Sequence, residues 1–424
     1  FIIKTNKMPQ SLKQAVLSLA FAAGIAAAWT TPSVLPSSSL SHRSSSELMA
    51  AKEPHNGEPS LDRRNFFQSA ATKAASLSLL VASSTSSLDV AYAADTTTYS
   101  KVYQPAPHSM DGKIVVITGG NAGLGLESSK RLAEAGATVV LTSRDEAKGQ
   151  KALDEINDYL SSQKGDATFA GKAMVASLDL CDLDNVKTFK DRLVNAIGKD
   201  TKIDVLMNNA GVMAIPDLRL TKDNYEKTFQ TNHLGHFALT STLLPFLSSD
   251  ARVINVSSMG YQFASKNGLE LDNLNGEKEY GPWTSYGQSK LENILFTNEL
   301  QKRAQNSKTW SNLMVFSLHP GAVQTDLARY LIGEEKFQDM KENGFSSWKD
   351  KVVMEGLANF VKTVREGAST QVFLAATADV GLAEAGKYFS DGKVVSVKAF
   401  ASDQAKGEEL WAVSEKLSGV TFDL

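Results

Sequence analysis

Short, continuous apolar runs alternate with longer polar stretches through the middle of this chain, and each run has the length of a buried strand. The clearest runs cover residues 113–118, 138–142, 173–180, 203–207 and 252–256. After the first run, Leu132, Ala133 and Ala135 follow a helical pattern, and a long polar helix is expected after residue 142. Strands that alternate with helices in this way predict an α/β fold with one doubly wound parallel sheet and helices on both faces.

The residues before this region contain segments that look like targeting signals. Residues 13–28 place a positive residue before an apolar run that ends in small residues, as in a secretory signal peptide. Residues 30–60 are rich in serine, proline and threonine, as a transit peptide is. Residues 63–93 begin with a twin arginine and end in Ala-Tyr-Ala, as a twin-arginine lumenal signal would. Disordered, low-complexity sequence is the alternative interpretation.

In this order, the segments resemble the tripartite presequence of a plastid that is surrounded by extra membranes. We therefore expect a targeting presequence in residues 1–93, a linker in residues 94–110 and the folded domain in residues 111–424. The thylakoid lumen is the expected location, and the plastid stroma or a thylakoid-associated position is the alternative. The apolar run in residues 13–28 is too short to be a confident membrane span, and we expect no transmembrane span in the mature chain.

Composition and charge argue against several classes of function. The chain has 42% hydrophobic and 21% charged residues, as globular proteins do, and its formal charge of -3 gives no reason to expect nucleic-acid binding. Cys181 is the only cysteine, which excludes an intrachain disulfide. His233 and His236 lie close together, but no third ligand is in view, so we interpret them as structural and expect no metal site.

A glycine-rich turn follows the first apolar run directly. Gly119, Gly123 and Gly125 let the backbone turn tightly before a helix, whose free amides and dipole favour a pyrophosphate. The spacing is GxxxGxG, whereas the general dinucleotide fingerprint is GxGxxG, and a turn without a ligand is the alternative. After the second run, Arg144 suits a 2′-phosphate and favours NADP(H), although the acidic Asp145 beside it weakens that argument.

Tyr286 and Lys290 stand four residues apart, on one face of an expected helix. The ammonium of Lys290 can stabilise a phenolate and so lower the pKa of Tyr286 towards the range of a general acid or base. A surface pair without function is the alternative, since these residue types meet at this spacing in many helices.

Six motifs stand in one order along the chain, over roughly residues 111 to 330. They are Thr118 to Gly125, Asn208 to Gly211, Asn232 in Thr-Asn-His-Leu-Gly-His-Phe, Ser258, Tyr286 with Lys290, and Pro320 with Gly321. In this order they resemble the short-chain dehydrogenase/reductase family, most closely its retinol dehydrogenase and protochlorophyllide reductase-like branch. The resemblance implies a single Rossmann-like, doubly wound parallel sheet. It makes residues 111–424 the family's domain, with a substrate-loop segment at about 326–362.

The resemblance also implies the catalytic roles. Tyr286 would protonate a carbonyl oxygen, or remove the alcohol proton, as hydride moves to or from a nicotinamide. Lys290 would lower the pKa of Tyr286 and hold the ribose hydroxyls. Ser258 would hydrogen-bond the substrate oxygen, with Ser257 as the competing residue. Asn232 would bend a helix and hold a water that links Lys290 to solvent, and a helix cap is its alternative interpretation.

The positions that the resemblance assigns to NADP(H) come from several loops. They are Gly119, Asn121, Gly123, Leu124, Gly125, Arg144, Asp179, Leu180, Asn209, Gly211, Tyr286, Lys290, Pro320, Gly321, Val323 and Thr325. Asp179, with the backbone of Leu180, matches the adenine contact, and a helix N-cap is the alternative interpretation of Asp179. Val323 and Thr325 match the contacts to the nicotinamide carboxamide.

Two stretches are expected to shape a substrate pocket. One lies before Tyr286 and contains Tyr261, Phe263 and Trp283. The other is segment 326–362, whose apolar residues follow helical spacing. That segment forms either a helix face packed on the core or a lid over a long, apolar substrate.

We therefore expect an NADP(H)-dependent oxidoreductase that interconverts a carbonyl and an alcohol on a bulky apolar compound, such as a retinoid or an isoprenoid. One alternative is a protochlorophyllide reductase-like enzyme that reduces a C=C bond in light. Family members of that kind carry a characteristic cysteine near the pocket, whereas Cys181 here lies beside Asp179, the expected adenine contact. The alanine after Gly321 also counts against this alternative. The other alternative is a non-catalytic, NADP(H)-sensing plastid protein. Family members commonly form dimers or tetramers, so a homo-oligomer is compatible with this interpretation.

Overall fold

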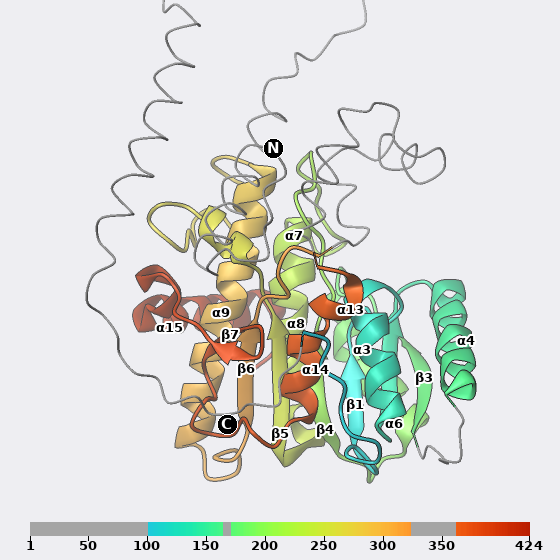
Figure 1. The fold of residues 1–424 in the computed structure, drawn as a ribbon. Coiled ribbons are helices and arrows are strands. Elements are labelled where there is room, and N and C mark those ends of the chain that lie inside the picture. Colours follow the sequence, from blue (N-terminus) through green and yellow to red (C-terminus); the bar gives the residue numbers. More distant parts are fainter. Residues whose placement is uncertain (1–100, 164–170, 324–361) are drawn as a thin grey trace, which may run out of the picture. The chain divides into compact units, whose positions relative to one another are not determined.

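The computed structural model describes residues 101–163, 171–323 and 362–424 (Figure 1). The expected presequence, the linker up to residue 100 and Thr325 lie outside these ranges. The substrate-loop segment also lies outside them, apart from its last residue, Lys362. The fold and the site are therefore built from the described ranges alone.

The described chain forms an eight-stranded sheet in the order β3-β2-β1-β4-β5-β6-β7-β8 (Figure 1). Its strands are β1 (Ile114–Ile117), β2 (Thr138–Ser143), β3 (Lys172–Ser177), β4 (Ile203–Asn208), β5 (Leu247–Val256), β6 (Met314–Leu318), β7 (Tyr388–Ser390) and β8 (Lys393–Val394). Neighbours from β3 to β7 pair in parallel, and β8 pairs antiparallel to β7. The chain winds outward in both directions from β1, which confirms the predicted doubly wound sheet.

The apolar runs locate the strands better than they locate the strand ends. The run at 173–180 continues past β3, which ends at Ser177. The amide of Leu178 still donates to the carbonyl of Ser143 at 3.1 Å, but the amide of Asp179 donates to the side chain of Asn185 at 3.0 Å. The pairing with β2 therefore stops after Leu178, because a side chain replaces the neighbouring strand as the partner of Asp179.

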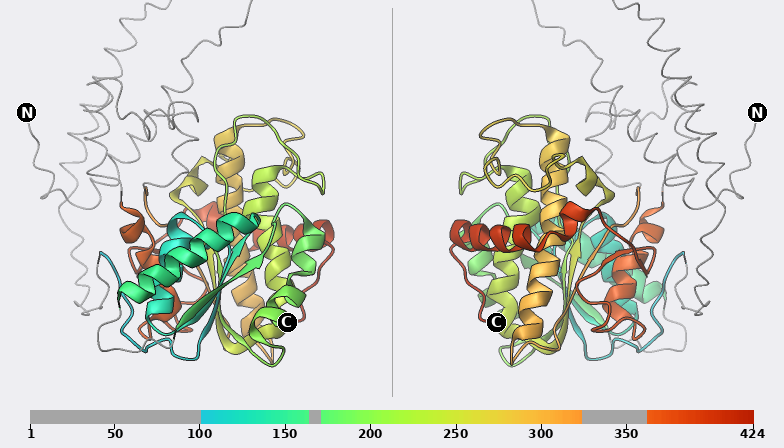
Figure 2. Two further views of the ribbon diagram at one scale, coloured as in Figure 1. Left: turned by 90° about the vertical axis from the view of Figure 1, so that its right-hand side faces the viewer. Right: turned by 90° about the vertical axis from the view of Figure 1, so that its left-hand side faces the viewer.

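Helices cover both faces of the sheet (Figure 2). One face packs against α3 (Gly123–Glu134), α4 (Glu146–Ser162) and α14 (Ser369–Ala376). The other packs against α5 (Leu183–Lys187), α6 (Phe189–Ile197), α8 (Gly235–Leu243), α9 (Pro282–Asn306) and α15 (Gln404–Ser418). Val116 of β1 enters one core, and Val115 and Ile117 enter the other, as alternate side chains of a buried strand must.

Short helical turns complete the described ranges. They are α7 (Lys227–Phe229), the π-helix η2 (Gln230–Leu234), the 3-10 helices η3 (Leu244–Phe246), η4 (Met259–Phe263) and η6 (Ala399–Ser402), and α13 (Val364–Gly367). In the part of the chain described here, no helix combines the length and the apolar character needed to cross a bilayer. Because the main strands are parallel, the loops at their carboxyl ends meet at one edge of the sheet, where ligands of such folds bind.

Candidate active site

The turn between β1 and α3 requires glycine at several of its positions. Gly119 and Gly123 have φ angles of 63° and 52°, in the left-handed region that favours glycine. A Cβ atom on Gly125 would lie 2.4 Å from the carbonyl oxygen of Gly119 and 2.6 Å from Asn209 Nδ2. Ala122, which precedes α3, gives the first amides of the helix no side-chain cap. A pyrophosphate fits this turn, since a helix N-terminus offers N–H donors and positive potential.

Three polar side chains hold the loop after β4 against the glycine turn. Thr118 Oγ1 accepts the amides of Asn209 and Ala210, both at 2.9 Å. Asn209 Nδ2 donates to the carbonyl of Thr118 at 2.8 Å. Gln371 of α14 donates to Asn209 Oδ1 at 3.2 Å and to Ser128 Oγ of α3 at 2.7 Å. Gln371 was not predicted, and its only sequence signal is a polar amide within an apolar helix.

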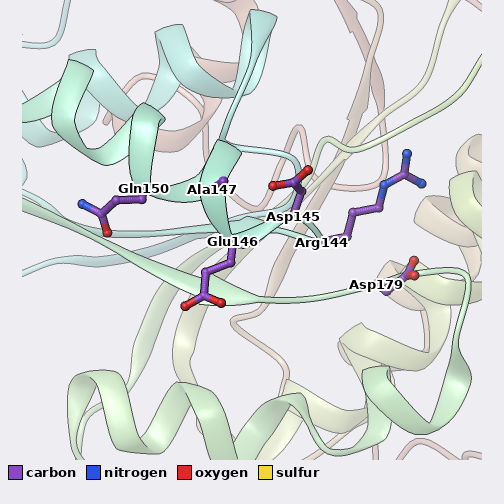
Figure 3. Close-up of a pocket in the computed structure, with 6 residues that line it drawn as sticks. All are labelled: Arg144, Asp145, Glu146, Ala147, Gln150 and Asp179. Atoms are coloured by element: carbon purple, nitrogen blue, oxygen red, sulfur yellow. The ribbon is translucent and has the colours of Figure 1, made fainter.

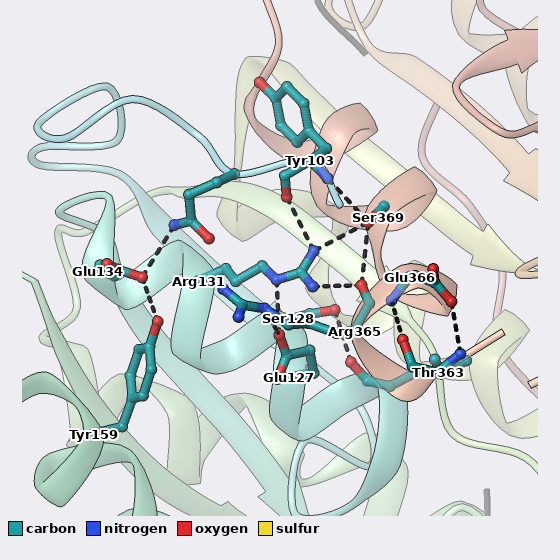
Figure 4. A network of polar contacts seen from close by, with 12 residues as sticks. Tyr103, Glu127, Ser128, Arg131, Glu134, Tyr159, Thr363, Arg365, Glu366 and Ser369 are labelled. Atoms are coloured by element: carbon teal, nitrogen blue, oxygen red, sulfur yellow. Dashed lines mark hydrogen bonds and ion pairs between the residues drawn. The ribbon is translucent and has the colours of Figure 1, made fainter. Parts of the chain in front are cut away.

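A buried arginine fixes α3 to elements on both sides of it (Figure 4). Arg131 donates from Nε to Glu127 Oε1 at 2.8 Å, within the same helix. Its guanidinium also donates to the carbonyl of Tyr103 at 3.0 Å, to Ser369 Oγ at 3.2 Å and to the carbonyl of Arg365. The helix that begins at the glycine turn is therefore locked to α13, which follows the substrate-loop segment in sequence.

An open cavity of about 790 Å³ lies at the carboxyl ends of β2 and β3 (Figure 3). It is lined by Arg144, Asp145, Glu146, Ala147, Gln150 and Asp179. The carboxylate of Asp145 caps α4, where it accepts the amide of Lys148 at 3.0 Å. Arg144 is exposed, and Figure 3 shows it on the same side of the cavity as Asp179, away from Gln150. Arg144 is therefore the cationic side chain that this cavity offers to an anion, while the carboxylate of Asp145 caps α4.

Asp179 and Leu180 lie in the loop after β3, beside this cavity. The carboxylate of Asp179 accepts the amide of Cys181 at 2.9 Å. The N-cap of α5 is Asp182, so the alternative interpretation of Asp179 as that cap is wrong. Leu180 is buried, and its carbonyl accepts a hydrogen bond from Gln230 Nε2 at 3.2 Å.

Two neighbouring serines that follow β5 make different hydrogen bonds. Ser257 Oγ is buried and donates to the carbonyl of Lys290 at 2.6 Å. Ser258 Oγ accepts the amide of Gly260 at 2.9 Å, which leaves its own proton for another acceptor. Ser258 is also the serine that is hydrogen-bonded to Tyr286. The geometry therefore favours Ser258 over Ser257 as the residue that faces a substrate oxygen.

Burial dominates the protonation of Tyr286 and Lys290 on α9. It raises the pKa of Tyr286 to about 12, with Ser258 acting in the opposite direction, and it lowers the pKa of Lys290 to about 8. Lys290 Nζ donates to the carbonyl of Val256 at 3.0 Å and lies 5.8 Å from the centre of the Tyr286 ring. The expected lowering of the Tyr286 pKa by Lys290 is not seen here, because removal from water dominates and Ser258 is the group that opposes it. At neutral pH Tyr286 holds a proton that it can donate.

Asn232 joins the loop after β4 to α9 from within the π-helix η2. Its Oδ1 accepts the amide of Val212 at 2.8 Å, and its Nδ2 donates to the carbonyl of Val212 and to Ser289 Oγ, both at 2.9 Å. A Cβ atom on Gly211 would lie 3.2 Å from Asn232 Oδ1 and 3.4 Å from Lys290 Nζ. Asn232 lies inside a helical turn, so its interpretation as a helix cap is wrong.

Apolar side chains pack around Tyr286. This apolar wall consists of Met213, Ala214, Phe263 and Trp283. The centre of the Trp283 ring lies 6.2 Å from that of Tyr286 and 5.9 Å from that of Phe263. Tyr261, which we also expected in the pocket, packs into a separate core cluster, because η4 turns its ring towards Tyr388.

The segment after β6 brings distant positions together. Gly321 has a φ angle of 87°, and its Cβ would lie 2.9 Å from Lys362 Cε. Val323 forms a parallel bridge with Lys362. A Cβ atom on Gly367 of α13 would lie 2.5 Å from Val323 Cγ2 and 3.0 Å from Leu124 Cδ2. Two predicted cofactor positions, Leu124 and Val323, therefore meet at Gly367, a residue that the sequence alone did not single out.

Every predicted site position that is described lies in a loop that follows a strand or in one of the helical elements α3, η2 and α9. These are Gly119, Asn121, Gly123, Leu124, Gly125, Arg144, Asp179, Leu180, Asn209, Gly211, Asn232, Ser258, Tyr286, Lys290, Pro320, Gly321 and Val323. Thr325 lies outside the described residues. In the ranges that the structure covers, no three His, Cys, Asp or Glu side chains are grouped as metal ligands would be.

Comparisons with known proteins agree with this architecture. The family model "short chain dehydrogenase" matches residues 113–336. Mouse "Retinol dehydrogenase 14" is 36% identical over 323 residues, which covers 74% of this chain and 88% of that protein. "Short-chain dehydrogenase TIC 32 A, chloroplastic" of Brassica napus is 31% identical over 320 residues, covering 73% of this chain and 90% of that protein. The crystal structure of an uncharacterized protein from Mycobacterium Paratuberculosis matches with a TM-score of 0.56 and 32% identity, over 77% of this chain and 100% of that one.

Proposed function

Because this chain belongs to the short-chain dehydrogenase family and is an oxidoreductase, we propose that it uses NADP(H) to interconvert a carbonyl and an alcohol on a bulky apolar substrate. This family is the one that the order of the sequence motifs predicted. The observation that carries the proposal is the meeting of Ser258, Tyr286 and Lys290 at the sheet edge, next to a glycine turn that fits a pyrophosphate. A bound nicotinamide would supply or accept the hydride.

The residues of the chain would handle the proton and the developing charge. Tyr286, with its raised pKa, donates its proton to the carbonyl oxygen in the direction of reduction. Ser258 donates a hydrogen bond from its hydroxyl to the same oxygen, while one of its lone pairs accepts the amide of Gly260. Lys290 stabilises the phenolate that forms, and Asn232 holds the neighbouring turn of α9 through Ser289. Together, these contacts make Tyr286 the general acid/base.

The preference for NADP(H) over NAD(H) rests on Arg144. A guanidinium recognises a phosphate through charge-assisted hydrogen bonds, and Arg144 is exposed at the cavity after β2. Asp145, which would otherwise favour a free ribose hydroxyl, is occupied as the N-cap of α4. The cavity therefore offers its cation to a 2′-phosphate.

The substrate class rests on the apolar wall beside Tyr286. Such a wall favours a hydrophobic body next to the reacting carbonyl. Several curated relatives carry the name retinol dehydrogenase, which agrees with a retinoid- or isoprenoid-like compound. A homo-oligomer also remains part of the proposal, as the family resemblance suggested.

The location and the domain boundaries are also proposals. A relative whose name includes "chloroplastic" supports a plastid. We propose that residues 1–93 act as the targeting presequence and that residues 111–424 form the catalytic domain, with the substrate loop at about 326–362. Delivery to the thylakoid lumen rests on the twin-arginine signal in residues 63–93. Import into isolated plastids, followed by fractionation, would test both the boundary and the compartment.

Turnover in the dark tests the reaction directly. NADPH oxidation would be followed by absorbance with a panel of isoprenoid and retinoid aldehydes, and with NADH in parallel. We expect dark turnover that prefers NADPH and falls by about 10²–10⁴-fold in Tyr286→Phe. NADPH binding without dark turnover would instead favour the light-dependent C=C reductase or the NADP(H)-sensing protein.

A further inference from the structure

His236 of α8 connects the two halves of the site, although none of the steps above uses it. Its ring is buried, one helical turn after Asn232. Nδ1 lies 3.0 Å from the carbonyl oxygen of Asn232, and Nε2 lies 2.8 Å from Thr118 Oγ1. One imidazole therefore spans from the end of β1 to the π-helix η2.

The donor and acceptor capacity of each group decides where the protons on His236 and Thr118 lie. A carbonyl oxygen only accepts, so Nδ1 of His236 must carry a proton and donate it to Asn232. Thr118 Oγ1 already accepts the amides of Asn209 and Ala210, both at 2.9 Å, so its hydroxyl must donate. Its nearest acceptor is Nε2 at 2.8 Å, against 3.4 Å to the carbonyl of Met207. Both ends require the same neutral tautomer, protonated at Nδ1.

The Thr118 end of this link belongs to the cofactor loops. Thr118 immediately precedes Gly119, and it holds the amides of the loop after β4. A Cβ atom on Gly119 would lie 3.1 Å from Ala210, so the two loops are in contact. A shift of the Thr118 hydroxyl would therefore move both loops that face the pyrophosphate and the ribose in our proposal.

The Asn232 end belongs to the acid/base machinery. A π-helical turn pairs an amide with the carbonyl five residues earlier, as Gly235 does here with Gln230, and such turns are rare and often lie at functional sites. The side chain of Asn232 is bonded to Ser289, the residue before Lys290. Fixing the Asn232 carbonyl therefore fixes the turn against which Lys290 is placed.

We propose that His236 is a positioning residue, which holds the cofactor loops and the Lys290 turn in one fixed geometry through Thr118 and Asn232. This inference rests on the proposed function of the site. His236 does not act as an acid or base itself. Burial, opposed by its bond to Asn232 and aided by nearby Lys290, lowers its pKa to about 4, so it stays neutral where Tyr286 and Lys290 titrate.

Two amide variants separate the ends of the link. Asparagine at 236 places an amide where Nδ1 stands and can still donate to Asn232, but it does not reach Thr118. Glutamine places an amide oxygen where Nε2 stands and can still accept from Thr118, but it does not serve Asn232. His236→Leu removes both contacts while keeping similar volume.

The variants should differ in which property they lose. We expect His236→Asn to weaken NADPH binding about tenfold and to keep the pH profile of turnover, because only the cofactor-loop contact is lost. We expect His236→Gln to keep NADPH affinity and to move the kinetic pKa by about one unit, because the Lys290 turn loses its support. His236→Leu should show both changes. Tryptophan fluorescence and pH–rate profiles measure the two properties separately.

His233 provides a matched control. It is a buried histidine in η2; its Nε2 is hydrogen-bonded to Ser414 of α15 at 2.9 Å and its ring also interacts with Asn293 of α9, so neither contact reaches the cofactor loops. His233→Asn should lower the unfolding temperature and leave both the NADPH affinity and the kinetic pKa unchanged. If His236→Asn and His236→Gln change both properties by equal factors, or change neither, the positioning role is refuted.

The test distinguishes failure of this inference from failure of the proposed function. If the native protein binds NADPH but turns over no carbonyl, the proposed function fails. The affinity difference between His236→Asn and His236→Gln then still tests the cofactor half of the link. If native turnover is normal and the two variants have the same NADPH affinity and the same kinetic pKa, the proposed function stands and the positioning role of His236 is refuted.

Discussion

The two ends of the candidate cofactor site are built in opposite ways. At the cavity after β2, Arg144 is exposed, so water and dissolved salt screen its charge. At the end of β5, Tyr286 is 7% exposed and Lys290 is 4% exposed, so loss of water controls their protonation. The comparison teaches that binding energy and reactivity are tuned separately here. Changes at the exposed end should alter affinity modestly, and changes at the buried end should alter rate and pH dependence strongly.

The largest expected effect is on turnover at the buried end. Lys290→Met removes the ammonium and keeps a side chain of similar length, so we expect turnover to fall by about 10²-fold or more. The fold should survive, because the carbonyl of Val256 that accepts from Lys290 also accepts from Asn293 Nδ2 at 3.3 Å. Steady-state kinetics beside a thermal unfolding curve measure the two effects. Native-like turnover in this variant would remove Lys290 from the mechanism.

The same residue should give the native protein a particular dependence of stability on pH. The pKa of Lys290 is 10.5 when unperturbed and about 8 in the folded protein. Between these values, the unfolded chain binds a proton that the folded protein does not, so the free energy of unfolding rises with pH. Over the whole window, the gain is about 3 kcal/mol relative to Lys290→Met.

Comparing the two proteins isolates this contribution. Tyr286, whose pKa is raised to about 12, lowers stability mainly above pH 10, beyond most of the window in which Lys290 acts. Denaturant titrations at pH 7.5, 9 and 10, roughly the span of the two pKa values, would show it. Parallel curves for the two proteins would mean that Lys290 has an ordinary pKa and is hydrated.

Some parts of the fold and of the candidate site could be predicted from the sequence alone. The runs that form β1, β2 and β4 were recognisable because strands buried on both faces are continuously apolar. The glycine turn and the Tyr286–Lys290 spacing were recognisable because local backbone geometry requires them. The family model and the sheet order confirm the fold that followed from these features.

Features that depend on distant contacts could not be recognised in this way. β7 has only three residues, too few to show a pattern, and it exists because β6 offers an edge to pair with. Gln371 and Gly367 contact the cofactor loops only after α13 and α14 fold back onto α3. Tyr261 and Trp283 are both aromatic residues before the catalytic tyrosine, and only packing decides that one joins the core and the other the apolar wall.

The glycine turn lies between the two ends and should give an intermediate effect. A methyl group on Gly125 would meet the carbonyl oxygen of Gly119, which cannot rotate away as a side chain could. We expect Gly125→Ala to lower stability by about 1–3 kcal/mol and to weaken NADPH binding. Gly381→Ala is the matched control, because nothing lies within 4 Å of its added methyl group. Equal melting curves for the two variants would show that the turn is looser than the structure has it.

The smallest expected effect belongs to the exposed end. Arg144→Ala removes the only cation among the residues that line the cavity, so we expect NADPH to bind about tenfold more weakly while NADH binding stays unchanged. Because the contact is exposed, added salt should reduce the native preference for NADPH and leave the variant almost unaffected. Arg144→Lys, which keeps the charge but loses the forked donor geometry, should fall between the two. If Arg144→Ala weakens NADPH and NADH binding equally, Arg144 supports the loop rather than the phosphate. The exposed end would then not bind the cofactor through charge, contrary to the comparison drawn above.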